Sequence, residues 1–288
     1  MRIWHALNNL PASRRCPLKL LIFCVGTFLI LYPKLWLLPR TVQRYADMNA
    51  VLDPDHPGLE PLAAEVRAGL ADDADPATAL WRVQQVVCGH VPYAYDWETW
   101  GVMEYLPTVD EVLRVGREDC DGRAVVAASL LRRLGYQAWL VSDLLHVWVQ
   151  TPEGETMSPT GNTKLIVATE RGSRLTNVAR PAVLANLAKG LAFGVAAFPL
   201  LRELLILALL VVLSWRPGSH FWRNLCGCLL LWIALDLLRH TGRQAALQAD
   251  WRHVLGASAA VGLALIGWLV LIVKAAGRRP RCGADSPR

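Results

Sequence analysis

Long apolar segments at both ends of the chain enclose a central region that carries most of the charged residues. Hydrophobic residues make up 53% of the 288 residues, a high share for a water-soluble protein. Residues 18–38 are apolar except for Lys19, Pro33 and Lys34, and a helix of this length crosses a hydrocarbon core about 30 Å thick. We therefore expect a membrane span here, followed by a folded domain outside the bilayer.

The first apolar segment is either an uncleaved signal anchor or a cleaved signal peptide. Arg14 and Arg15 precede it, as basic residues do in both kinds of segment. Residues 32–36 (YPKLW) offer no small-residue cleavage site. We therefore favour the uncleaved anchor.

Three more apolar blocks follow the central region, at residues 191–214, 221–238 and 254–273. The first contains Arg202 and Glu203, and the second is short and contains Asp236, so either block could be a tilted or partial span. The third block has no charged residue. Together with residues 18–38, these blocks predict about four transmembrane helices.

Basic residues at both ends of the chain set its expected orientation. They are Arg2, Arg14, Arg15, Lys274, Arg278, Arg279 and Arg281. Because positive flanks stay in the cytoplasm, both tails are expected there, which requires an even number of crossings. The chain is then a multi-pass protein of the inner (cytoplasmic) membrane, with its central domain on the periplasmic, extracytoplasmic side. Three arginines in residues 239–252, on the same outer side, oppose this orientation.

The charge distribution and the apolar blocks indicate which partners to expect. Residues 40–190 hold 20 acidic against 14 basic side chains, so the excess of basic charge lies in the membrane flanks and no nucleic acid is expected as a partner. The lipid bilayer is an expected partner. Small residues in the last block, Gly256, Ala260, Gly262 and Gly267, favour close helix packing in a bundle or a homo-oligomer.

The seven cysteines do not form a disulfide framework. Only Cys88 and Cys120 fall in the central region, and we interpret Cys88 as a packing residue. The Cys226-Gly227-Cys228 motif lies in an apolar block, where we interpret it as packing rather than metal or redox chemistry. The histidines other than His146 are scattered without ligand spacing, so we expect neither a metal site nor a cofactor.

Local signals in the central region predict an α+β domain. Asp75 is an expected helix cap followed by a proline, Thr108 and Glu111 match a capping box, and Gly135 ends a helix. The expected helices cover residues 60–70, 76–88, 108–116 and 121–134, and the expected strands cover 137–142, 146–151 and 155–159. In the last helix, apolar residues recur at helical spacing, which predicts one buried face. The helix would pack on an antiparallel sheet.

Composition and these elements divide the chain into six expected segments. They are a cytoplasmic tail with a signal-anchor helix at 1–39, a stalk and leading helix at 40–75, the central domain at 76–170, a linker at 171–190, C-terminal transmembrane helices at 191–274 and a basic cytoplasmic tail at 275–288.

Cys120 and His146 are the candidate catalytic residues. Cys120 lies at the head of the helix expected at 121–134. Unpaired backbone N–H groups and the helix dipole favour a thiolate at that position. His146 begins the second strand, and an imidazole beside a thiol can act as its base. Glu118, Asp119 and Asp121 surround the thiol and oppose activation, because negative neighbours raise a thiol pKa.

The order of these elements resembles the transglutaminase-like branch of the papain-like superfamily. The motifs that carry this resemblance are residues 107–113 (PTVDEVL), 120–122 (CDG), 134–138 (LGYQA), 146–149 (HVWV) and 158–161 (SPTG). They fall within residues 76–165, about a third of the chain. The resemblance implies a cysteine that attacks an amide carbonyl, a histidine that activates it, and an aspartate that orients the histidine.

Cys120 and His146 match the first two roles, and the third position departs from the family. Where the family reads Asp-Pro-Thr, this chain has Ser158 before Pro159 and Thr160. A hydroxyl accepts a hydrogen bond but holds an imidazolium less firmly than a carboxylate does. We expect Ser158 to take this position, with Glu155 and Asn162 as alternatives.

Three functions are compatible with these features. The leading hypothesis is a membrane-tethered cysteine peptidase or amidase that acts on a peptide or protein substrate through a thioester, with water as the acceptor. The alternative, motivated by Ser158, is an inactive or weakly active domain that binds proteins or peptides. A third hypothesis, transport or signalling by the helical bundle, rests only on Arg202, Glu203 and Asp236.

Overall fold

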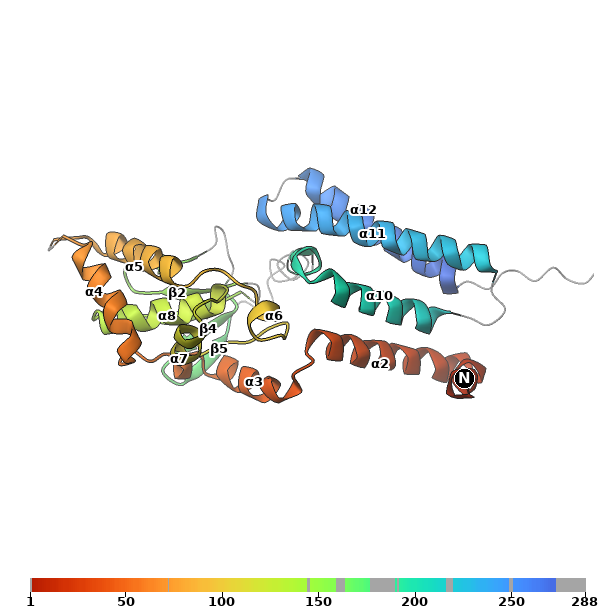
Figure 1. Ribbon diagram of the computed structural model, residues 1–288, viewed down its shortest axis with the longest axis horizontal. Helices are drawn as coiled ribbons and strands as arrows, with labels where there is room; N and C mark the ends of the chain where they lie inside the picture. Colours follow the sequence, from red (N-terminus) through yellow and green to blue (C-terminus); the bar gives the residue numbers. More distant parts are fainter. Residues whose placement is uncertain are drawn as a thin grey trace, which may run out of the picture. The chain divides into compact units, whose positions relative to one another are not determined.

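The computed structural model describes residues 2–71, 73–143, 146–158, 164–176, 190, 192–215, 220–248 and 251–272. The chain forms two compact units (Figure 1). Residues 1–27 and 192–288 make up the helical unit, and residues 28–191 make up the mixed unit. The alternative site residue Asn162, most of the expected linker and the basic tail at 275–288 lie outside the described residues.

An antiparallel sheet forms one layer of the mixed unit. Its strands are β1 (Trp139–Ser142), β2 (Val147–Gln150), β3 (Glu155–Thr156), β4 (Ile166–Thr169) and β5 (Gly172–Leu175), in the spatial order β3-β2-β1-β4-β5. The expected three-strand meander is confirmed by the β1–β2 and β2–β3 pairs. Strands β4 and β5 were not expected, and they extend the sheet beyond β1.

The helices of the mixed unit are α3 (Leu38–Ala46), α4 (Glu60–Ala68), α5 (Pro76–His90), α6 (Asp96–Thr99), α7 (Val109–Val115) and α8 (Cys120–Arg133). Four of them, α4, α5, α7 and α8, begin and end near the expected residues, whereas α3 and α6 were not expected. Asp75 caps α5 by accepting the Thr78 N–H at 3.0 Å, and Thr108 and Glu111 form the expected capping box on α7. Gly135, at φ 92°, follows the end of α8.

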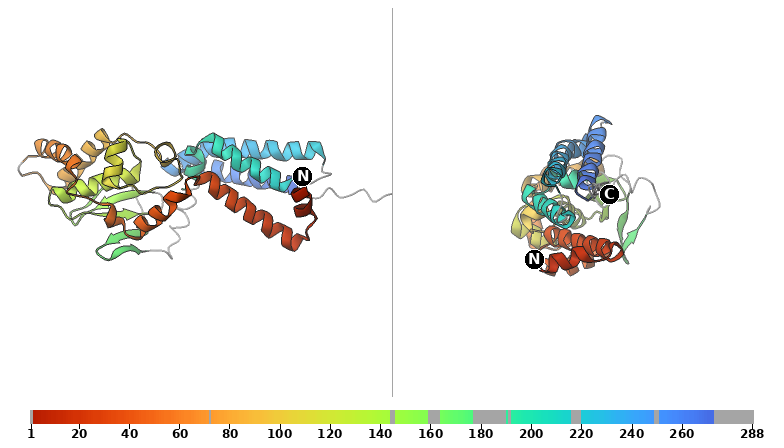
Figure 2. Two further views of the ribbon diagram at one scale, coloured as in Figure 1. Left: turned by 60° about the horizontal axis from the view of Figure 1, so that its bottom comes forward. Right: turned by 90° about the vertical axis from the view of Figure 1, so that its right-hand side faces the viewer.

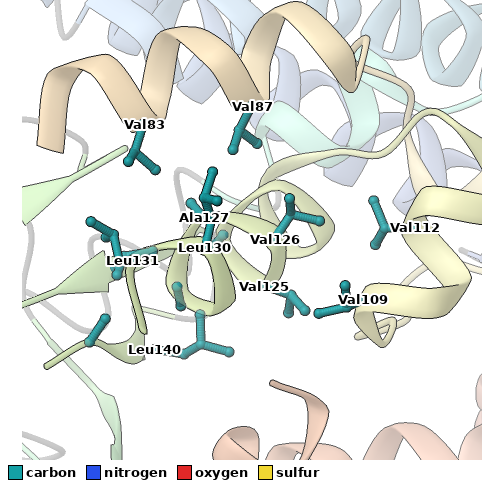
Figure 3. Packing of buried hydrophobic residues seen from close by; sticks show 14 of the residues in the cluster. Val83, Val87, Val109, Val112, Val125, Val126, Ala127, Leu130, Leu131 and Leu140 are labelled. Atoms are coloured by element: carbon teal, nitrogen blue, oxygen red, sulfur yellow. The ribbon is translucent and has the colours of Figure 1, made fainter. Parts of the chain in front are cut away.

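Helix α8 is the centre of the hydrophobic core. Every residue of α8 between positions 124 and 131 is buried, so the expected apolar face is buried and the other positions of this stretch are buried as well. The helix lies between the sheet and the other helices, and therefore both of its sides are covered. Figure 3 shows this packing, with Val87 of α5 on one side of α8, Val109 of α7 beside it and Leu140 of β1 on another side.

The segment expected as a stalk is packed against the mixed unit. Met48 and Val51, in the short helix η2 (Met48–Val51), belong to the main core and are 0% and 2% exposed. The Asp53 N–H donates to Ser129 Oγ of α8 at 3.1 Å. The turn signals that suggested a stalk therefore connect short helices that cover the core, η2 and η3 (Pro57–Leu59).

The helical unit contains the membrane-span candidates. Its helices are α1 (Arg2–Asn9), α2 (Ala12–Leu31), α10 (Leu200–Ser214), α11 (Phe221–Gln248) and α12 (Trp251–Ile272). Within the described residues, α11 and α12 are long and apolar enough to cross a membrane. Helix α2 and residues 35–46 pass the same test as a pair bent by 81°. The structure thus supports two or three spans, and α10, with 15 residues, is shorter than a span.

Two boundaries in this unit differ from the expected ones. The helix in the span expected at residues 18–38 ends at Leu31, two residues before Pro33. A proline restricts the backbone of the residue before it and cannot donate a helical hydrogen bond, so it ends the helix here. The loop expected at 239–252 is helical as far as Gln248, since α11 continues past the apolar block.

Helices α11 and α12 lie side by side (Figure 2), and they approach closely at two glycines. A Cβ atom on Gly227 would lie 3.1 Å from the Gly267 carbonyl oxygen, and one on Gly267 would lie 3.1 Å from the Gly227 carbonyl oxygen. This contact agrees with the expected role of small residues in the last apolar block. An ion pair between Glu203 and Arg239 connects α10 to α11.

Candidate active site

Cys120 is the first residue of α8, as the sequence predicts. Asp119 caps the helix by accepting the Asp121 N–H at 3.2 Å. The Cys120 thiol donates to Asp121 Oδ1 at 3.2 Å, and the backbone N–H of Val147 points at the sulfur. Burial raises the thiol pKa well above its usual value, with further increases from the charges of Asp121 and Asp119. These effects act against the stabilisation of a thiolate by the helix dipole.

His146 lies immediately before β2, and its ring is held by the main chain. Its Nε2 is 2.7 Å from the carbonyl oxygen of Met157. A carbonyl oxygen only accepts hydrogen bonds, so Nε2 carries the proton and the neutral ring has its lone pair on Nδ1. His146 therefore has the tautomer that leaves Nδ1 as a base.

Met157 is fixed in an unusual backbone conformation. Its φ of 60° makes it the one non-glycine residue with positive φ in the described part of the chain. Gln84 of α5 accepts hydrogen bonds from the Met157 N–H at 3.1 Å and from Thr156 Oγ1 at 3.2 Å. Left-handed backbone at a non-glycine residue persists only where the surroundings enforce it. Gln84 is thus a positioning residue for the carbonyl that holds His146, a role that no motif in the sequence indicated.

The structure places Ser158 at an exposed position beside Glu155. Its side chain is exposed, and its hydroxyl donates to Glu155 Oε2 at 2.7 Å. Glu155, the first alternative, also pairs with Lys164 at 2.6 Å. Within the described residues, neither side chain bonds to His146. The His146 ring is oriented instead by the backbone carbonyl oxygen of Met157, the residue before Ser158. A search of the sequence for polar side chains does not consider backbone carbonyls.

Cys120 lies near the residue that follows His146 in the chain. The sulfur faces the N–H of Val147, the residue next to His146 in the chain. In the part of the chain that the structure describes, no hydrogen bond joins the thiol to the imidazole. The Cys120–His146 pair therefore stays a prediction, with Cys120 at the start of α8 and His146 immediately before β2.

Five carboxylates gather around Cys120, and the sequence predicted only three of them there. Asp96 of α6 and Glu104 of the following loop join Glu118, Asp119 and Asp121. Burial and the mutual repulsion of these groups raise the pKa of Glu118 to about 7 and that of Asp119 to about 8, and they raise the pKa values of Asp96 and Asp121 well above their usual range.

Among the described residues, three sets of side chains around Cys120 have the spacing of metal ligands. In each set the ligand atoms lie within 4.8 Å of one another. The sets are Asp119, Cys120 and Asp121; Asp96, Glu104 and Asp121; and Asp96, Glu118 and Asp119. The sequence-based expectation of no metal site considered histidine spacing alone, and it did not anticipate this convergence of carboxylates.

Gly122 makes room for one of these carboxylates. A Cβ atom on Gly122 would lie 2.1 Å from Glu118 Cγ and 2.9 Å from Val112 Cγ2. We expect Gly122→Ala to lower the free energy of unfolding by about 1–3 kcal/mol, because Glu118 and α7 must shift. Urea denaturation measures this change. In the matched control Gly89→Ala, on α5, an added Cβ meets nothing within 4 Å, and equal effects of the two substitutions would contradict the prediction.

Comparisons of this chain with protein-family models, with curated proteins and with solved structures find no match in any of the three.

Proposed function

We propose that this chain is a membrane-tethered, transglutaminase-like cysteine hydrolase, a peptidase or amidase that acts on a peptide or protein substrate. The observation that supports it best is the position of the Cys120 sulfur at the N–H of Val147, beside a histidine whose Nε2 is fixed by Met157. A thiol at a helix N-terminus and an oriented imidazole on a neighbouring strand are the components of a cysteine nucleophile.

The proposed reaction uses these two residues in sequence. Nδ1 of His146 takes the proton of the Cys120 thiol, and the sulfur attacks the amide carbonyl carbon. His146 returns the proton to the leaving amine, which leaves an acyl group on sulfur as a thioester. Water, deprotonated by His146, then cleaves the thioester to a carboxylic acid and the free thiol.

The membrane helices place this reaction at the bilayer. An even number of spans, with both tails in the cytoplasm of an inner membrane, would put the mixed unit on the periplasmic side. The orientation is supported by the basic flanks at Arg14, Arg15 and Lys274.

A second candidate function is favoured by the environment of the thiol. Cys120 donates to Asp121 rather than to His146, and burial together with nearby carboxylates raises its pKa. A thiol that stays protonated is a poor nucleophile. The mixed unit would then be an inactive or weakly active domain that binds proteins or peptides.

Alkylation with an iodoacetamide probe separates the two functions. In the full chain at neutral pH, labelling of Cys120 is compared with labelling of Cys88, which is partly buried in the same unit. Labelling faster than that of Cys88 and slowed by His146→Ala supports catalysis. Labelling of Cys120 that is no faster than that of Cys88 supports the binding domain.

Gln84 provides a test of how His146 is oriented. We expect Gln84→Ala to lower the His146-dependent part of the Cys120 alkylation rate about tenfold, because two hydrogen bonds that hold the Met157 segment are lost. The control is Gln85→Ala, one residue along α5, where the side chain is exposed. A rate that is the same in both variants would show that Gln84 does not position the ring.

A further inference from the structure

Three carboxylates from separate segments of the mixed unit converge beside Cys120. Asp96 begins α6, Glu104 lies in the loop after it, and Asp121 is the second residue of α8. One oxygen of each lies within 4.8 Å of the others. Oxygen atoms with this separation can ligate one ion, since two ligands on opposite sides of Ca²⁺ at ~2.4 Å are about 4.8 Å apart.

Asp96 has an oxygen that the protein leaves without a partner. Its side chain is 2% exposed, and Oδ2 accepts the Tyr105 N–H at 2.5 Å. Oδ1 is completely buried and has no hydrogen-bond partner among the described residues. A buried carboxylate oxygen without a partner is strongly unfavourable. An ion held by Asp96, Glu104 and Asp121 would satisfy this atom if Oδ1 is the Asp96 oxygen that binds it.

The protein supplies little positive charge to this cluster. None of the ion pairs in the described part of the chain involves Asp96, Glu104, Glu118, Asp119 or Asp121. The Tyr45 hydroxyl contacts Glu104 at 2.5 Å and Asp121 at 3.0 Å, and it offers only one proton. Buried carboxylates need a counter-charge or bound protons to remain inside the protein.

The chemistry of the ligands selects the kind of ion. Carboxylate oxygens favour hard cations such as Ca²⁺ and Mg²⁺, whereas Zn²⁺ sites are mostly built from cysteine and histidine. Ca²⁺ tolerates irregular coordination, and Mg²⁺ requires a tighter octahedron. Glu104 is only partly buried, so one ligand remains in contact with solvent.

We propose that Asp96, Glu104 and Asp121 bind a hard divalent cation, with Ca²⁺ preferred over Mg²⁺. The site lies next to the thiol, but binding of the ion requires no reaction at Cys120. The inference therefore extends beyond the proposed hydrolase and can be tested separately from it.

Calorimetric titration of the full chain in detergent, after treatment with EDTA and dialysis, tests this proposal. We expect one equivalent of Ca²⁺ to bind at or below about 1 mM, with a rise in the thermal unfolding midpoint. Asp96→Asn and Glu104→Gln should each weaken Ca²⁺ binding at least tenfold. Glu153→Gln, which removes an exposed carboxylate from the turn between β2 and β3, should match the wild type.

Each remaining outcome decides the question. Binding of Mg²⁺ at the same stoichiometry and with the same dependence on Asp96 supports the site. Binding of Zn²⁺ alone, or no binding of any ion to the folded wild type, overturns the proposal and indicates that the carboxyl groups hold protons. Because Glu104 is partly exposed, Glu104→Gln keeps the test decisive even if Asp96→Asn does not fold.

Discussion

Raising the pH from 4.5 to 8 is expected to destabilise the mixed unit. The pKa of Glu118 rises from its ordinary 4.5 to about 7 on folding, first because of burial. Between these values the unfolded chain is ionised while the folded chain keeps its proton, so folding binds protons and stability falls as pH rises. A pKa shift of this size corresponds to about 3 kcal/mol of unfolding free energy. This contribution to stability is lost in full above pH 7.

The other carboxylates of the cluster act in the same direction. Asp119, with a pKa of about 8, extends the loss of stability to higher pH.

Glu111 acts in the opposite direction, because its pairing with Arg44 lowers its pKa. Its stabilising effect is therefore lost only as pH falls below the range of an ordinary glutamate. The two effects therefore act in separate pH windows.

Urea denaturation in EDTA, followed by tryptophan fluorescence, measures this dependence without a bound divalent cation. Glu118→Gln is the control, because it removes one titrating proton and should make the profile less steep between pH 4.5 and 7, with the slope from Asp119 remaining. A wild-type stability that stays constant or increases across this range would contradict the prediction.

Cys120→Ala is expected to abolish peptide cleavage, and His146→Ala to lower it by about 10²–10⁴-fold. The first variant removes the atom that forms the thioester, and the second removes the base that accepts its proton. Incubation of the full chain with a peptide library, followed by mass spectrometry of the products, measures both effects.

Cys88→Ala is the matched control, since it removes a partly buried cysteine from the same unit and should cleave as the wild type does. If wild type, Cys120→Ala and His146→Ala all release the same products at the same rate, Cys120 is not the nucleophile and the hydrolase proposal is wrong.

Local signals predicted the helices of the mixed unit well. Asp75, Thr108 and Gly135 act through their own turn of the chain, so their caps could be identified from neighbouring residues. The meander of β1, β2 and β3 followed from short connections between consecutive strands. Strands β4 and β5 lie beyond the last motif that the sequence offered.

Contacts between distant segments could not be predicted in this way. Nothing near Asp96 or Glu104 indicates that they meet Asp121, because that contact depends on how α6 and its loop fold over α8. The orientation of His146 by the Met157 carbonyl was missed for a related reason, since every residue has a carbonyl and its direction depends on φ and ψ.

Helix α3 links the membrane-proximal chain to the site through two consecutive side chains. Arg44 bonds to the Leu106 carbonyl oxygen at 2.8 Å and to Glu111 at 2.7 Å, and Tyr45 bonds to Glu104 and Asp121. A shortened protein that starts at residue 76, the boundary suggested by composition, would lack both anchors and the hydrogen bonds that they donate to Leu106, Glu111, Glu104 and Asp121. Recombinant versions intended for biochemistry should therefore start ahead of Leu38.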